Sequence, residues 1–229
     1  MQKEPPNSRR ALLYGGVDPS GSPLRPSGVA ILDDRLGVIA AETRFDDAEL
    51  IAFFARHRYG LFAVGLDGPC ALPVGLQECC FQSGEPTCSH EQPEGRRGRL
   101  CERELARRGI GCFFTVKRSF AKSWVLRSIG LYRQLRGAGF VVHEVYPYAS
   151  KRLLFGPQMA AKQTSAGRVL LASALTQLGI VLPRQQLSHH ELDAIVAAHT
   201  VYLLAHGRAE LVGDAQEGYI VIPGGVAKP

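Results

Sequence analysis

Residues 11–18 read ALLYGGVD, and the arrangement of the whole chain can be predicted outward from them. Seven apolar or small residues lead directly into an acid, Asp18, and residues 19–23 (PSGSP) then have the composition of a turn. The pattern predicts a buried strand with a carboxylate at its C-terminal end. Residues 61–67, LFAVGLD, repeat it, so that Asp67 closes a second buried strand.

Strands and helices alternate outward from these two stretches. Apolar runs at 28–32 and 38–43, separated by DDRLG, predict an antiparallel hairpin after the first strand. A further strand is predicted over 140–145, with a small terminal hairpin over 211–212 and 219–222. Helices are predicted over 45–57, 100–108, 121–139, 165–178 and 191–206. We therefore expect an α/β protein with a mixed sheet flanked by helices.

The length of 229 residues fits a single domain, 1–229. Between residues 68 and 112 the periodicity is lost and Gly, Pro, Cys and Arg dominate, which predicts a Cys/Arg-rich insertion or long elaborated loop within that domain. With 45% hydrophobic and 21% charged residues, the chain is not disordered, fibrous or a coiled coil. It has no apolar run of about 18 residues and no signal peptide, so we expect no membrane association and a cytoplasmic location.

Positive charge is concentrated in the middle of the chain. The formal net charge is +6, but residues 94–136 carry twelve lysines and arginines against three acids. A solvated helix face is one explanation, but the concentration favours a surface that faces a polyanion such as nucleic acid. Candidates for phosphate contacts are Lys117, Arg118, Lys122 and Lys151. Tyr146, Tyr148 and Trp124 are candidates for stacking on bases, with core packing as the alternative.

All six cysteines lie between residues 70 and 112. A cytosolic location argues against a disulfide framework. His90 and four of the cysteines offer ligands for a structural zinc ion, for which we select Cys79, Cys80, Cys88 and Cys101. Because Cys79 and Cys80 are adjacent, the spacing matches no paired C-x-x-C pattern, and thiols without a special role are the alternative.

Four acids lie in apolar surroundings, where an unpaired carboxylate is costly. Asp18 and Asp67 end strands, Glu144 lies within the strand 140–145, and Asp193 is in the first turn of the last long helix. Each alone has a simpler explanation as a turn, solvent-facing or helix-terminal residue. Taken together, however, the strand ends meet at one edge of the sheet, and a helix across that edge can add Asp193. Carboxylates gathered in this way are ligands for Mg²⁺ or Mn²⁺. Two such ions, roughly 3.5–4 Å apart, would clamp a scissile phosphate.

The stretches GGVDPSG, VGLDGPCALP, CERELARRGIGCFFT, HEVYPYASK, HHELDAIVAAHTVYLLAHGRAE and EGYIVIP resemble the domain-of-unknown-function family 429 over nearly the whole chain. That family is described as predicted nucleases of the ribonuclease H fold. The order of strand and acid, hairpin, helix, strand and acid, and later helix with Asp is likewise similar to the ribonuclease H-like superfamily. The resemblance implies a ribonuclease H-like mixed sheet.

The resemblance also implies metal-ligand and catalytic roles for Asp18, Asp67, Glu144 and Asp193, with Asp18 bridging both metals. The segment 190–194, HELDA, is similar to the last helix of RuvC-type junction resolvases. There, a His or Asp lies three residues before the final Asp, which puts His190 and Asp193 on one helical face. His190 would then orient or deprotonate the attacking water, with a helix-capping or surface histidine as the alternative.

A metal-dependent nuclease acting on DNA or RNA is the function that these features favour. A non-catalytic nucleic-acid-binding protein of the same fold is the alternative. A sugar-kinase-like or actin-like use of ATP is less favoured, because those proteins duplicate the fold and the chain has no P-loop sequence. Hydrolysis through Cys70 lacks a histidine placed to activate it. A junction-resolving role would require a homodimer, and the oligomeric state stays open.

Overall fold

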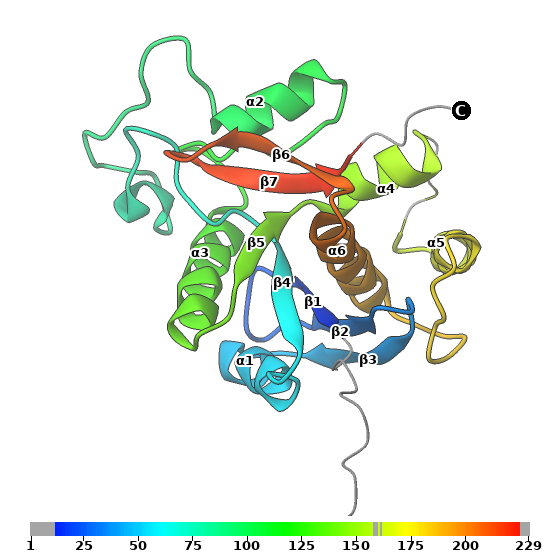
Figure 1. Cartoon of the computed structure of the whole chain (residues 1–229). Helices are drawn as coiled ribbons and strands as arrows, with labels where there is room; N and C mark the ends of the chain where they lie inside the picture. Colours follow the sequence, from blue (N-terminus) through cyan, green and yellow to red (C-terminus); the bar gives the residue numbers. More distant parts are fainter. Residues whose placement is uncertain (1–11, 158–159, 161, 225–229) are drawn as a thin grey trace, which may run out of the picture.

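A computed structural model describes residues 12–157, 160 and 162–224 (Figure 1). Its strands are β1 (Leu13–Asp18), β2 (Ser27–Asp33), β3 (Val38–Arg44), β4 (Leu61–Asp67), β5 (Val142–Val145), β6 (Ala209–Asp214) and β7 (Gly218–Pro223). They form one seven-stranded sheet in the order β3-β2-β1-β4-β5-β7-β6. β1, β4, β5 and β7 are parallel, while β2 and β6 are antiparallel to their neighbours. This mixed sheet confirms the predicted fold class and is consistent with a ribonuclease H-like arrangement.

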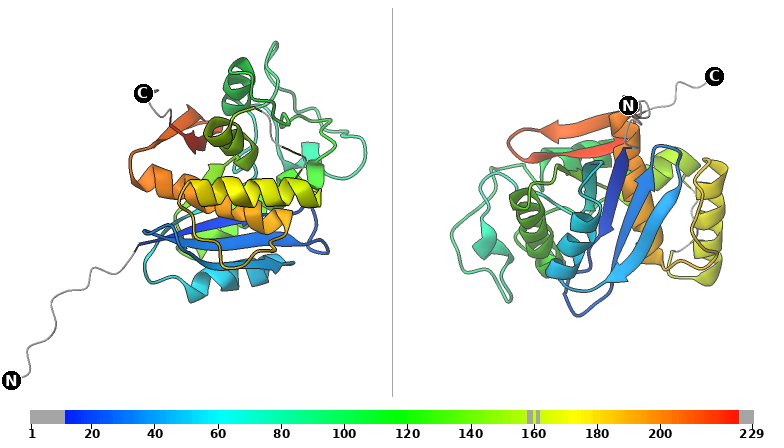
Figure 2. Two further views of the ribbon diagram at one scale, coloured as in Figure 1. Left: turned by 90° about the vertical axis from the view of Figure 1, so that its right-hand side faces the viewer. Right: turned by 60° about the horizontal axis from the view of Figure 1, so that its bottom comes forward.

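Helices cover both faces of the sheet (Figures 1 and 2). They are α1 (Asp47–Arg56), α2 (Leu100–Arg107), α3 (Lys122–Gly137), α4 (Pro147–Phe155), α5 (Ser165–Gln177) and α6 (His189–Ala205), with a short 3₁₀ helix, η1 (Glu78–Phe81). α1 and α3 enclose one core, which includes Phe53, Phe54 and Leu131. α5 and α6 enclose a second core on the opposite face. Within the described residues, no helix is both long enough and apolar enough to cross a membrane.

α6 is the central helix of the molecule and is buried along most of its length. It begins at His189 because the Ser188 hydroxyl accepts a hydrogen bond from the backbone N–H of Glu191, and the Glu191 carboxylate accepts one from the N–H of Ser188. This start lies two residues before the predicted one. Asp193 is therefore the fifth residue of α6, and the prediction that it lies in the first turn is wrong.

Glycines in the sheet let α6 lie directly on the strand backbones. A Cβ atom on Gly16 of β1 would lie 2.0 Å from the carbonyl oxygen of Ala194, and one on Gly28 of β2 would lie 2.0 Å from that of His190. Neither contact leaves room for any side chain, because the obstructing atoms belong to the helix backbone. The two glycines thus fix the depth of α6 on the sheet.

Two helices in the structure were absent from the sequence prediction. α4 begins at Pro147, which tolerates a first-turn position because its missing N–H would have no helical partner there. η1 lies in the predicted insertion and is too short for a periodic pattern. Ala11, the first residue of the predicted first strand, lies outside the described residues.

We predict that Gly28→Ala lowers the free energy of unfolding by about 1–3 kcal/mol or more, because its methyl group must push the α6 backbone off the sheet. The matched control is Gly130→Ala within α3, where a Cβ would meet no atom within 4 Å. That variant should gain about 0.5–1 kcal/mol from helix propensity. Urea unfolding of the three proteins checks both values. Equal stability of Gly28→Ala and the original chain would contradict the packing described for α6.

Candidate active site

Asp18 and Asp67 lie side by side at the C-terminal edge of the sheet. β1 and β4 are adjacent and parallel, with Val17 opposite Leu66, so the next residue on each strand is one of the two acids. The Asp18 side chain is almost buried, with the residue 7% exposed, and Asp67 is half-buried. The sheet register therefore brings together the two acids that the strand patterns predict.

α6 brings His190 and Asp193 to the same edge. His190 Nδ1 lies 2.6 Å from Asp18 Oδ2. Asp193 is 1% exposed and lines the same cavity as Asp18 and Asp67. The predicted pairing of His190 and Asp193 on one helical face is thus present, and that face is directed at the strand acids.

Two lysines hold the Asp193 carboxylate. Lys151 of α4 donates from Nζ to Asp193 Oδ1 at 2.6 Å, and Lys162, which precedes α5, donates to Oδ2 at 2.5 Å. Lys151 is buried, whereas about a third of the Lys162 side chain is exposed (36%). Lys162 was not among the sequence candidates, since it lies in an aperiodic segment between two helices.

The pKa values of Asp67 and Asp193 are shifted in opposite directions. Burial, followed by repulsion from Asp18 and Asp193, holds the pKa of Asp67 well above its usual range. Burial would also raise the pKa of Asp193, but Lys151 and Lys162 outweigh it and lower that pKa. Among the described residues, no group donates a hydrogen bond to the Asp67 carboxylate. Lys162 and Lys151 oppose the rise in the pKa of Asp67 from a distance, but neither forms an ion pair with it as both do with Asp193.

The three aspartates open into a cavity of about 580 Å³. Its polar side is formed by these acids with Lys151 and Lys162, and its apolar side by aromatic residues: Phe113, Phe120, Trp124, Tyr146 and Tyr148. Phe113 and Phe120 form an edge-to-face pair although they are 63% and 83% exposed. The three aromatic residues chosen from the sequence all lie here. Phe113 and Phe120 were missed, since an aromatic residue in an irregular loop gives no periodic signal.

Glu144 lines a second, smaller cavity together with Asp67, but its oxygens are already bound. It accepts hydrogen bonds from Arg99 Nη1 at 2.7 Å and Nη2 at 2.6 Å, and from the backbone N–H of Cys70 at 2.8 Å. Arg99, 2% exposed, also donates to Glu102. Burial raises the pKa of Glu144, and Arg99 opposes that rise. This buried ion pair ties the insertion to β5, and a metal-ligand role for Glu144 stays a prediction.

Only one of the four predicted phosphate-binding residues, Lys151, reaches the aspartates. Lys117 Nζ donates to the carbonyl oxygens of Cys88 and His90 and to Glu91 Oε1. Lys122 Nζ donates to the carbonyl oxygens of Gln82 and Gly84. Arg118 is exposed beside Arg96 and Arg97. The nucleic-acid contacts of these residues stay predictions.

Comparison with known proteins identifies the family. The family model described as "Protein of unknown function (DUF429)" matches residues 16–217, which is most of the chain. The chain belongs to this family. The matched region contains every predicted catalytic residue. A search of curated proteins finds no match.

One ligand predicted for zinc in this DUF429 chain is wrong. Cys101 is buried against β6 and β7, in an apolar cluster with Leu105, Val212 and Ile220. The Sγ atoms of Cys79, Cys80 and Cys88 instead lie together with a ring nitrogen of His90. Cys101 faces the opposite way because it belongs to the apolar stripe of α2, which packs on the terminal hairpin.

Glu144→Gln should lower the free energy of unfolding by about 3 kcal/mol, because it removes one partner of a buried ion pair while Glu102 still faces Arg99. It should leave Mn²⁺ affinity unchanged, since Arg99 and the backbone N–H of Cys70 already occupy the Glu144 oxygens. Urea unfolding and calorimetric titration with Mn²⁺ test the two halves. Loss of Mn²⁺ binding at unchanged stability would instead make Glu144 a metal ligand.

Proposed function

We propose that this DUF429 protein is a metal-dependent nuclease that hydrolyses phosphodiester bonds of DNA or RNA. The observation that carries the proposal is the meeting of three aspartates from β1, β4 and α6 in one cavity. Three carboxylates are costly to gather in a partly buried site unless a cation neutralises them. That need is greatest at Asp67, where burial and the two other aspartates outweigh the opposing effect of Lys162 and Lys151.

The donor set fits Mg²⁺ or Mn²⁺. Asp18, Asp67 and Asp193 offer carboxylate oxygens, which are the ligands that these hard cations prefer. We exclude Glu144 from the ligand set because Arg99 and the Cys70 amide occupy its oxygens. When bound, a divalent cation supplies Lewis-acid stabilisation of the phosphate and activation of water.

His190 and the lysines supply the remaining chemistry. In the neutral tautomer that donates Nδ1–H to Asp18, His190 carries its free lone pair on Nε2, which can accept a proton from water. Lys162 is partly exposed at the cavity and offers a cation to the phosphate backbone. The exposed rings of Phe113 and Phe120 offer surfaces for base stacking.

One observation favours the alternative, a nucleic-acid-binding protein without catalysis. Lys151 and Lys162 already neutralise Asp193. Their ammonium groups occupy the two carboxylate oxygens that would otherwise be free to bind a metal ion. In that case the cavity would bind nucleic acid through lysines and aromatic rings alone.

Cleavage assays on single- and double-stranded DNA and RNA, with Mg²⁺ or Mn²⁺, distinguish the two functions. Asp18→Asn should reduce cleavage by about 100-fold or more, since losing even an outer partner of a metal ligand costs 10–100-fold. Nucleic-acid binding should stay equal or become tighter, because a negative charge is removed. The control is Glu94→Gln, which removes an exposed acid that does not line the cavity.

Cleavage that is equal in the original chain and Asp18→Asn would contradict the proposed site. Nucleic-acid binding without cleavage by either protein would assign the non-catalytic function.

A further inference from the structure

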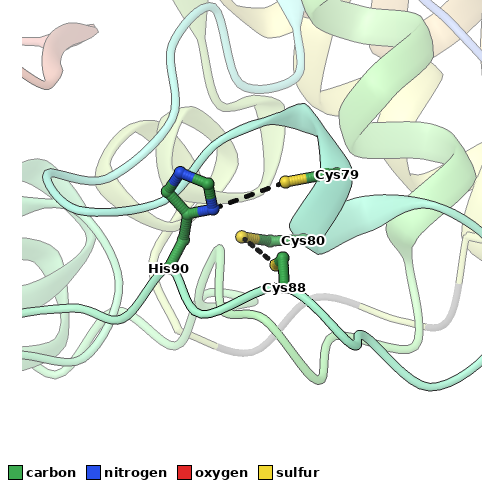
Figure 3. Close-up of side chains that lie close together, drawn as sticks. All are labelled: Cys79, Cys80, Cys88 and His90. Atoms are coloured by element: carbon green, nitrogen blue, oxygen red, sulfur yellow. Dashed lines mark hydrogen bonds between the residues drawn. The ribbon is translucent and has the colours of Figure 1, made fainter.

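A cluster of three cysteines and a histidine lies in the insertion, outside the aspartate cavity (Figure 3). Cys79 and Cys80 come from η1, while Cys88 and His90 come from the loop that follows. One side-chain ligand atom of each lies within 4.8 Å of all the others. In Figure 3 the four side chains converge on a common point from two segments of the chain.

The spacing of these atoms suits a tetrahedral metal ion. Cys79 Sγ lies 3.6 Å from His90 Nδ1, and Cys80 Sγ lies 3.3 Å from Cys88 Sγ. A zinc ion with Zn–S of about 2.3 Å and Zn–N of about 2.0 Å holds its ligand atoms roughly 3.5–3.8 Å apart. The cysteines are free thiols, and 3.3 Å is far longer than a disulfide of about 2.05 Å.

We propose that Cys79, Cys80, Cys88 and His90 bind a structural zinc ion that holds the insertion in its fold. The adjacency of Cys79 and Cys80 is no obstacle, because the tight turn of η1 brings both sulfur atoms to the same site. Four protein ligands with no vacant position are the mark of a structural rather than a catalytic zinc site.

The insertion has little regular secondary structure to hold its shape. Between β4 and α2, the described chain contains no regular element except the four residues of η1. Its apolar cluster against α3 is small, consisting of Leu76, Cys80, Phe81, Val125 and Ile129. Small apolar cores are commonly reinforced by a disulfide or a bound metal ion. The zinc ion would join η1 to the loop at Cys88.

Lys117 supports the metal ligands from outside. Its Nζ donates to the carbonyl oxygen of Cys88 at 2.6 Å and to that of His90 at 2.8 Å. Three thiolates around Zn²⁺ leave one net negative charge, which the ammonium group of Lys117 offsets. The lysine chosen from the sequence as a phosphate contact is thus placed to stabilise the zinc site.

The proposed zinc site is connected to the aspartate cavity through residues that line the cavity. Trp124 lines that cavity and packs against the apolar cluster that contains Cys80, as Cys79 and Cys88 also do. Lys117 connects the ligand loop to residues 113–121, which contribute Phe113 and Phe120 to the same wall. Zinc would therefore order the aromatic side of the cavity. These contacts are the same whether or not the protein is a nuclease.

The test is the zinc content of the purified full-length chain, measured by inductively coupled plasma mass spectrometry. We expect one zinc per chain, and close to none in Cys79→Ser and Cys88→Ser. The matched control is Cys112→Ser, a half-buried thiol outside the cluster, which should keep its zinc. Equal zinc content in all four proteins would overturn the assignment.

Titration of chelator-stripped original chain with Co²⁺ avoids any folding defect of the variants. We expect the strong visible and near-ultraviolet absorption of tetrahedral thiolate-bound Co²⁺, and its loss when zinc is added. Proteolysis within residues 68–99 should slow on metal addition. Absence of this absorption, or a Cys80–Cys88 disulfide found by mass spectrometry in protein that takes up no metal, would overturn the proposal.

Discussion

The contact between α6 and the glycine backbones of β1 and β2 is the constraint on which the site depends. Gly16 and Gly28 meet the carbonyl oxygens of Ala194 and His190 with no space for a side chain. A helix seated this deeply carries Asp193 to the strand edge at Asp18. Any larger residue at either glycine would lift the helix and separate the carboxylates that the strands and the helix contribute.

Once the aspartates are gathered, their environments follow from what each one faces. Asp193 forms ion pairs with two lysines, Asp18 is hydrogen-bonded to the imidazole of His190, and Asp67 has neither kind of partner among the described residues. The chain also contains a contrasting acid, Glu144, whose charge is balanced by Arg99 within the protein. The charge of Glu144 is balanced inside the protein, whereas the charge of the aspartate group is balanced only in part. This difference distinguishes Glu144 from the candidate metal ligands.

The strands, Asp18, Asp67 and Asp193 could be predicted because short apolar runs that end in an acid, and an acid near the start of an apolar helix, are local signals. Sequence reasoning could not place Lys162 or the pairing of Glu144 with Arg99, since nothing in a local pattern reports a contact between distant segments. It predicted the wrong fourth zinc ligand for the same reason. Cys101 and His90 are both near the other cysteines in sequence, and only the packing of α2 on the terminal hairpin removes Cys101 from the cluster.

We propose that the meeting point of Asp18, Asp67 and Asp193 is a divalent-cation site. The most direct test is a crystal of the protein soaked in Mn²⁺, with anomalous diffraction recorded at the manganese absorption edge. We predict an anomalous peak bounded by these three carboxylates, with Lys162 moved away from Asp193. A map without a peak among the three aspartates, or with manganese at Glu144 instead, would contradict the account.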